Sequence, residues 1–127
     1  MKGKIDDVGR PLIAIRVIGS GGGKAWTGEA WIDTGFTGDL VLPLAVIGDL
    51  ALTTAYRLSV RLADGTVSEV DSYEAKLDWF GRQRSVEVVA GDAALPLVGI
   101  NLLLGLELIA DYRNLQLSLS PKPKMKT

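Results

Sequence analysis

The amino-acid sequence predicts a mostly β domain with one or two short helices, either closed into a barrel or layered as a sandwich. Apolar and polar residues alternate with a period of two in several segments, which is typical of strands with one buried face. Turns that contain glycine separate these segments, and helical periodicity is sparse. Short strands joined in this way are typical of closed or layered β domains.

Each expected element has its own signal in the sequence. Isoleucine and valine occupy every second position of 13–17, which predicts one strand, and 85–90 is expected to form a further one. Apolar residues alternate with Arg and Ser in 56–62, and leucine alternates with polar residues in 115–119. Two segments, 43–52 and 102–112, favour short helices, the second beginning after Gly105. The expected turns lie at 19–23, 63–66, 81–82 and 91–92.

Composition narrows the class of protein. The chain has 127 residues, 47% of them hydrophobic and 23% charged, which is typical of one globular domain. Its 14 Lys and Arg against 15 Asp and Glu give a net charge of −1, so nothing indicates a nucleic-acid or membrane partner. No segment has the pattern of a signal peptide or a membrane span, and we expect a cytoplasmic protein. We expect one domain over 10–120, with flexible ends at 1–9 and 121–127.

The chain contains neither cysteine nor histidine. Thiol nucleophiles, disulfides, cysteine or histidine metal sites and imidazole bases are therefore excluded. An enzyme built from this sequence has to rely on carboxylates, hydroxyls, lysine or a metal bound by oxygen atoms. No metal site or cofactor motif is evident, and we expect neither.

The most informative segment is Asp33-Thr34-Gly35. An apolar strand runs directly into Asp33, so a rigid element would present the carboxylate where the chain turns. Gly35 permits a tight turn and close approach of a ligand, and Thr34 supplies a hydroxyl that can hold the loop. This pattern favours an aspartate that activates water. The alternative is a strand-ending aspartate in an Asx-turn.

The order of features resembles that of the retropepsin-like aspartic proteases, single-lobe relatives of pepsin. In that family an apolar strand enters Asp-Thr-Gly, a flap hairpin and a second hairpin follow, and an apolar-apolar-Gly motif precedes a short helix. Here the corresponding segments are 31–35, a flap-like turn at 63–66, a turn at Gly81, and Leu103-Leu104-Gly105. The segment 33–43 is especially similar to bacterial members. The resemblance covers about 10–120 and implies a closed barrel of one lobe.

The resemblance also implies roles for single residues. Asp33 would be catalytic, and Thr34 would hydrogen-bond across a dimer axis. Gly35 would offer its carbonyl to substrate, while Leu104 and Gly105 would brace the loop from below. The substrate-binding residues would be Gly35, Phe36 and Thr37 beside the aspartate, and Ala63, Asp64 and Gly65 at the tip of the flap.

Three positions depart from the family pattern. Phe36 replaces a small residue, and its ring would either narrow the substrate subsites or fill the interior. Thr37 and Leu106 stand where many members pair an Asp with an Arg. Because both charges are missing together, no unpaired buried charge results, and another contact has to brace the loop.

The chain has one Asp-Thr-Gly, whereas hydrolysis by this mechanism needs two carboxylates, one as base and one as acid. The resemblance therefore implies a homodimer with Asp33 of each chain on the twofold axis, cleaving polypeptides. One alternative is a dimerisation or peptide-binding module without catalysis. The other is a carboxylate hydrolase, such as a glycosidase, that uses a second acid of the same chain.

Overall fold

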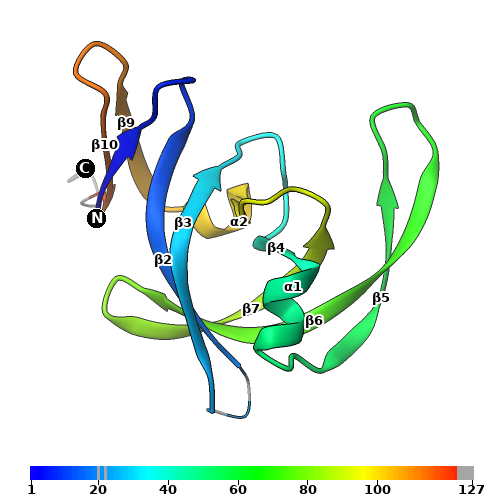
Figure 1. The fold of residues 1–127 in the computed structure, drawn as a ribbon. Helices are drawn as coiled ribbons and strands as arrows, with labels where there is room; N and C mark the ends of the chain where they lie inside the picture. Colours follow the sequence, from blue (N-terminus) through cyan, green and yellow to red (C-terminus); the bar gives the residue numbers. More distant parts are fainter. Residues whose placement is uncertain (20, 22, 123–127) are drawn as a thin grey trace, which may run out of the picture.

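The computed structural model describes residues 1–19, 21 and 23–122, without the side chains of residues 58 and 60. Strands dominate these residues, and two short helices interrupt them (Figure 1). The helices are α1 (Leu44–Asp49) and α2 (Ile100–Leu103). The strands are β1 (Lys2–Ile5), β2 (Pro11–Gly19), β3 (Ala25–Ile32), β4 (Leu40–Pro43), β5 (Thr54–Arg61), β6 (Val67–Trp79), β7 (Arg82–Gly91), β8 (Leu97–Val98), β9 (Leu106–Asp111) and β10 (Gln116–Pro121).

Six of the strands close into a barrel. The ten strands follow the order β5-β6-β7-β4-β8-β3-β2-β1-β10-β9, and a further pairing joins β6 to β2. That pairing, with Val17 opposite Leu77, closes the circle β2-β3-β8-β4-β7-β6. The closed barrel confirms the first of the two architectures that the sequence predicts.

Side chains that alternate along the barrel strands fill its interior. In β2, Ile13, Ile15 and Val17 are buried in the core, and the polar residue Arg16, which lies between the last two, is exposed. Removing such side chains from water contributes about 25 cal/mol per Å² of apolar surface. α1, which lies within the expected helix 43–52, adds its buried residues Val46 and Ile47 to the same core.

β5 and β6 form a long hairpin, called here the flap hairpin together with its turn at 62–66. β6 is 13 residues long, and only its second part pairs with the barrel strands β7 and β2. Its first part pairs with β5, and the hairpin stands away from the barrel (Figure 1). The turn is closed by the Leu62 N–H, which donates to the Thr66 carbonyl at 2.8 Å. The flap-like turn expected at 63–66 is confirmed.

The expectation of a flexible segment over 1–9 is wrong for its first part. β1 pairs with both β10 and β2, and the Met1 ammonium donates to the Leu119 carbonyl at 2.8 Å. The segment is short and mostly polar, so only pairing with distant strands makes it a strand. β10 extends to Pro121, one residue into the expected tail 121–127; residues 123–127 lie outside the described residues.

The prediction of a helix after Gly105 is also wrong, because that segment forms the strand β9. All six residues of β9 pair with β10, and Leu106 and Leu108 pack against the core from one face of the strand. The mixture of apolar and polar residues fits helical periodicity as well as strand alternation, and the partner strand decides between them. The short helix α2 lies just before Gly105, not after it.

Candidate active site

Asp33 follows the last residue of β3, and its backbone is fixed by the neighbouring strand. β3 and β8 run parallel, with Ile32 opposite Val98. The Asp33 N–H donates to the Val98 carbonyl at 2.9 Å. The side chain is half-buried at the end of the barrel strand. A buried strand thus presents one carboxylate at the rim of the barrel, as the sequence predicts.

One oxygen of the Asp33 carboxylate also holds the turn that follows it. Oδ1 accepts the Gly35 N–H at 2.9 Å, and the Asp33 carbonyl accepts the Phe36 N–H at 3.2 Å. This is the Asx-turn that the sequence left open as the alternative interpretation. The turn engages one carboxylate oxygen, and Oδ2 accepts no hydrogen bond from the residues described. The turn is therefore compatible with catalysis and does not by itself indicate it.

The loop 33–39, called here the Asp33 loop, rests on the segment that joins β8 to α2. Backbone N–H groups of Gly99, Ile100 and Asn101 donate to the carbonyls of Asp39, Phe36 and Gly38, at 2.9, 2.7 and 3.2 Å respectively. A Cβ atom at Gly99 would lie 2.1 Å from the Gly38 carbonyl oxygen, so only glycine fits. Three consecutive amides therefore brace the loop through its backbone.

This brace is not the one expected from the sequence. Leu104 is 68% exposed, and Gly105 lies in the turn between α2 and β9, where no atom would come within 4 Å of an added Cβ. Neither residue packs under the Asp33 loop. The same apolar-apolar-Gly pattern occurs earlier, at Leu97-Val98-Gly99, and the parallel pairing of β8 with β3 gives that copy the bracing position.

Asp39 adds a side-chain brace that the sequence analysis missed. Its Oδ2 accepts the Glu87 N–H at 2.9 Å, and its Oδ1 accepts an N–H of the Asn101 side chain. One carboxylate therefore joins the Asp33 loop to β7 and to α2. The family's Asp-Arg pair is absent at Thr37 and Leu106, and the Asp39 contacts provide another brace. The sequence signal for this role was the presence of an acidic residue so close to the Asp-Thr-Gly motif.

The other residues of the loop differ in exposure. The Phe36 ring packs against Gly38 and Gly99, since added Cβ atoms there would lie 2.5 and 2.6 Å from it. This favours the interpretation that the ring fills the interior of the loop. Thr34 and Thr37 are exposed beside it.

At the tip of the flap hairpin, Ala63, Asp64 and Gly65 are all exposed. Asp64 Oδ1 accepts the Thr66 N–H at 2.9 Å and the Thr66 hydroxyl at 2.7 Å. The hydroxyl, followed by the backbone N–H, lowers the pKa of Asp64 below its ordinary value. These contacts make Asp64 a turn-forming residue, and among the described residues no hydrogen bond or ion pair joins the tip to the Asp33 loop.

A hollow of about 320 Å³ lies between β7 and the base of the flap hairpin. The Tyr56 hydroxyl donates to the Glu87 carboxylate across it. Glu87 is the residue whose backbone N–H binds Asp39, so the hollow adjoins the brace of the Asp33 loop. Its lining residues are Ala55, Tyr56, Tyr73, Glu74, Ser85, Val86 and Glu87.

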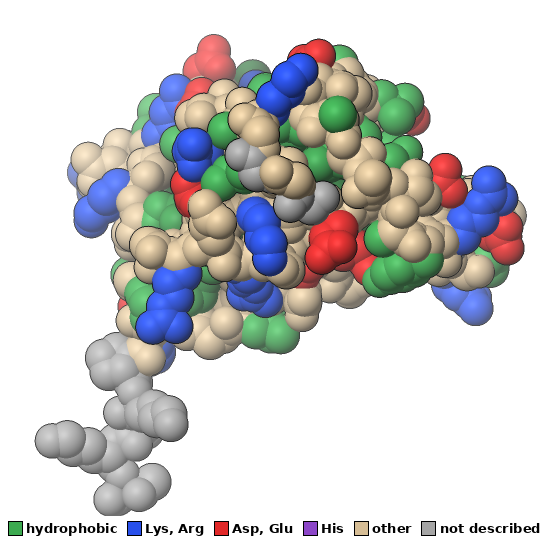
Figure 2. All heavy atoms as spheres, turned by 90° about the horizontal axis from the view of Figure 1, so that it is seen from below, with side chains coloured by type: hydrophobic (Ala, Val, Ile, Leu, Met, Phe, Trp, Pro, Cys, Tyr) green, Lys and Arg blue, Asp and Glu red, His purple; other side chains and the backbone are tan. Residues whose placement is uncertain are grey.

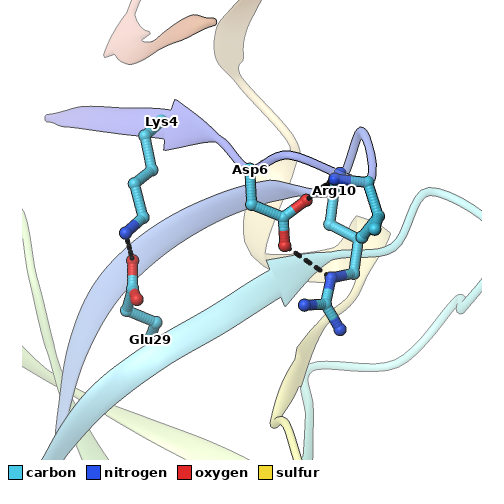
Figure 3. A network of polar contacts seen from close by, with 5 residues as sticks. Lys4, Asp6, Arg10 and Glu29 are labelled. Carbon is cyan, nitrogen blue, oxygen red and sulfur yellow. Dashed lines mark hydrogen bonds and ion pairs between the residues drawn. The ribbon is translucent and has the colours of Figure 1, made fainter.

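A polar cluster holds the turn between β1 and β2 beside the end of β3 (Figure 3). Arg10 Nε lies 2.6 Å from Asp6 Oδ2, and the Arg10 guanidinium lies 5.7 Å from the centre of the Trp31 ring. Hydrogen bonds from Arg10, first from its backbone N–H, lower the pKa of Asp6. Trp31 is two residues before Asp33, so this cluster supports the same end of the barrel.

On the face drawn in Figure 2, basic and acidic side chains are interspersed, so this face is neither mainly positive nor mainly negative. Among the described residues, no three Asp or Glu side chains gather where they could hold a metal ion. In the same part of the chain, neither helix is long and apolar enough to cross a membrane.

Neither a protein-family model nor a curated protein sequence matches this chain. Solved structures do match it. A retropepsin-like aspartic protease from Rickettsia conorii superimposes with a TM-score of 0.64 at 15% identity, over 95% of this chain and 89% of that one. EIAV protease, solved in complex with the inhibitor HBY-793, superimposes with a TM-score of 0.54 at 18% identity, over 74% of this chain and 85% of that one. The chain therefore has the retropepsin-like fold of aspartic proteases.

Proposed function

We propose that this protein is a homodimeric aspartic peptidase. The observation that carries the proposal is the placement of Asp33. It directly follows a barrel strand of the retropepsin-like fold, and three consecutive backbone amides brace the loop that it begins. Such a loop holds a carboxylate in one position, and fixed geometry is what a catalytic group requires.

The chemistry explains why two chains are needed. One carboxylate takes a proton from water, which attacks the carbonyl carbon of the peptide bond. The other group, a carboxylic acid, gives its proton to the carbonyl oxygen, which yields a tetrahedral intermediate with two hydroxyl groups. When this intermediate collapses, the first carboxyl group gives the proton that it took from water to the leaving amine, and the second carboxylate takes back a proton from one hydroxyl. Two carboxylates at about 3 Å share one proton, because like charges at that distance do not both ionise easily. The sequence has a single Asp-Thr-Gly, so the second Asp33 comes from a second copy.

The substrate we propose is an extended polypeptide that lies between the Asp33 loop and the flap hairpin. Its backbone would be bound partly as an added strand, by hydrogen bonds to Gly35 and to the turn 63–65. Thr34 would hydrogen-bond to its counterpart across the axis, and Thr37 would line the cleft. A cytoplasmic location and a domain over 10–120 remain predictions.

A mixed peptide library tests this function. We expect wild-type protein to cleave peptides between acid and neutral pH and Asp33→Asn to lose at least about a thousandfold in rate, because the amide keeps the shape but not the acid-base chemistry. Asp49→Asn, at the exposed end of α1, is the matched control and should cleave like the wild type. Mass spectrometry reads the products. Cleavage that persists in Asp33→Asn would contradict the proposal.

The second candidate is a dimerisation or peptide-binding module on the same fold. It is favoured by the use of Asp33 Oδ1 within its own turn, and by a flap turn with a single glycine, Gly65. This function predicts that Asp33→Ala binds peptides as tightly as the wild type, as measured by calorimetry, and that neither protein cleaves them.

A further inference from the structure

The hollow between β7 and the base of the flap hairpin is lined by two carboxylates of like charge. Glu74 of β6 and Glu87 of β7 lie directly opposite one another in the antiparallel pair of strands. Side chains of opposed residues point to the same face of a sheet, so the two carboxylates share one side of it. Like charges in this position destabilise a sheet. The fold therefore carries an unfavourable pair at the wall of a cavity.

The described part of the chain does not neutralise this pair. Among the described residues, neither Glu74 nor Glu87 forms an ion pair. Lys76 lies two positions along β6 on the same face, but its ammonium donates to the Ser85 hydroxyl at 2.6 Å. The Glu87 carboxylate accepts the Tyr56 hydroxyl. Because two carboxylates together can accept about eight hydrogen bonds, most of their capacity is left for a ligand that donates hydrogen bonds.

Tyr56 adds an aromatic ring to the same hollow. Its hydroxyl reaches the Glu87 carboxylate across the hollow, so the ring lies beside the two acids. Tyr56 is 53% exposed and Glu74 is exposed as well, so a ligand can enter from solvent. An aromatic face beside carboxylates favours an organic cation, above all the planar guanidinium group, which stacks on rings and binds carboxylates through paired hydrogen bonds. The volume of about 320 Å³ is small for a ligand pocket and suits a single side chain.

We propose that this hollow binds the guanidinium group of an arginine in the polypeptide substrate, at a position away from the scissile bond. Glu74 and Glu87 accept hydrogen bonds from the guanidinium, and the Tyr56 ring packs against its plane. A positive charge between two negative ones offsets the repulsion between them. The inference rests on the proposed function for the molecule that carries the arginine, and it names a feature of that substrate.

The place of the hollow in the fold favours the substrate as the source of this arginine. One side of the hollow belongs to the flap hairpin. The other belongs to β7, where the Glu87 N–H donates to Asp39 of the Asp33 loop at 2.9 Å. The substrate is proposed to lie between these same two parts of the molecule. A contact made away from the reacting bond supplies binding energy that helps to position that bond, so an arginine held here would increase the rate of cleavage.

Binding of a blocked arginine tests the site without any cleavage. The protein is titrated at low salt with N-acetylarginine amide and, for comparison, with N-acetylcitrulline amide, which has nearly the same shape but no charge. We expect the arginine compound to shift the amide NMR signals of Glu74, Ser85 and Glu87 in a saturable way. Its Kd should be at least about tenfold lower than that of the citrulline compound. Equal binding of the two compounds, or shifts that spare the hollow, would overturn the inference.

Glu74→Gln removes one of the two carboxylates and keeps the size of the side chain. We expect the Kd of the blocked arginine to rise at least about fivefold in this variant. Glu29→Gln, which removes a carboxylate of β3 that pairs with Lys4 (Figure 3), is the matched control and should bind like the wild type. Because Glu74→Gln also removes the repulsion from Glu87, its melting temperature should not fall, and weaker binding would not reflect unfolding. Unchanged binding in Glu74→Gln would contradict the site.

Cleavage of the mixed peptide library tests whether the arginine belongs to the substrate. We expect the cleaved peptides to be enriched in arginine at one position away from the scissile bond. Replacing that arginine by citrulline in one such peptide should lower kcat/KM at least about fivefold. Glu74→Gln should cleave the arginine and citrulline peptides at similar rates, because the group that distinguishes them is weakened. If Glu74→Gln keeps the full preference for arginine, another part of the molecule recognises it.

The outcomes separate this inference from the proposed function. A protein that cleaves peptides through Asp33, but binds the arginine and citrulline compounds alike, would overturn the arginine site alone. A protein that binds the arginine compound in the hollow and cleaves nothing would support the site and count against the peptidase. Binding of the arginine compound without any arginine preference in cleavage would overturn the assignment of the arginine to the substrate.

Discussion

The Asp33 loop and the tip of the flap hairpin are held in opposite ways. The loop donates a backbone hydrogen bond to β8 and accepts others from Gly99 and α2, and its residue Asp39 accepts a backbone N–H of β7. The tip is held by contacts within its own turn, from Leu62 to Thr66 and from Thr66 to Asp64. A segment with many partners opens only when much of the domain unfolds, whereas a segment with few can open alone. This division suits a peptidase, whose carboxylate must stay fixed while substrate enters under the flap.

The largest expected effect comes from the glycine beneath the loop. Gly99→Ala would place a methyl group 2.1 Å from the Gly38 carbonyl oxygen, so the backbone has to move. We expect the free energy of unfolding, measured in urea, to fall by about 3 kcal/mol.

The control for this variant is Gly48→Ala in α1. No atom lies within 4 Å of the added Cβ there, and alanine is the better helix former. Stability should rise by about 0.5 to 1 kcal/mol. Equal losses in the two variants would mean that the loop is not held as described.

A smaller loss is expected at the side-chain brace. Asp39→Asn directs an amide group toward the Asn101 amide, and Asn101→Asp directs a carboxylate toward the Asp39 carboxylate. Each single variant therefore removes the hydrogen bond between the two side chains. Each should lower the free energy of unfolding by about 1 to 3 kcal/mol. The double variant exchanges the two groups, and the hydrogen bonds to Glu87 and between the side chains can form again.

We therefore expect the exchanged pair to regain most of the stability and, if the protein is a peptidase, most of kcat. Calorimetry and peptide cleavage measure the two. Additive losses in the double variant would show that Asp39 and Asn101 do not act on one another.

Substitutions at the flap tip should affect the domain less. Gly65 has φ of +89°, which other residues rarely adopt, so Gly65→Ala should cost about 1 kcal/mol. Because the tip opens locally, the loss should appear first as faster exchange of the Thr66 amide, with less change in the melting temperature. If the melting temperature fell as much as in Gly99→Ala, the flap tip would not open independently of the domain, and the contrast between the two regions would be wrong.

The smallest effect concerns pH. The Thr66 hydroxyl and N–H lower the pKa of Asp64 in the folded state, so this stabilisation of the turn is present above the ordinary value of 3.8 and is lost as pH falls through the lowered pKa. We expect the Thr66 amide to exchange faster, relative to intrinsic rates, below that range. Asp64→Asn should weaken this dependence, whereas an unchanged pH profile would show that the turn is held in another way.

Local patterns in the sequence predicted more of the barrel than of its ends. Alternation located the strands around Val17, Val60 and Leu117, and the apolar strand before Asp33 placed the carboxylate correctly. β1 was missed because its partner β10 lies far along the chain, and β9 was missed because its pattern fits a helix as well as a strand until it pairs with β10. The brace was assigned to Gly105 instead of Gly99, since both follow two apolar residues and only the pairing of β8 with β3 distinguishes them. The position of Asp39 beside the motif was visible in the sequence, but its bracing contacts were not, because its partners are 48 and 62 positions away.

The contact between Met1 and Leu119 joins residues 118 positions apart, and it has a consequence for the time course of folding. During synthesis β1 leaves the ribosome early, whereas β10 follows after nearly all of the barrel. Closing so long a segment costs entropy before its contacts contribute, so structures with many such pairings acquire their native state slowly. β1 therefore waits for its second neighbour until almost the whole domain has been translated.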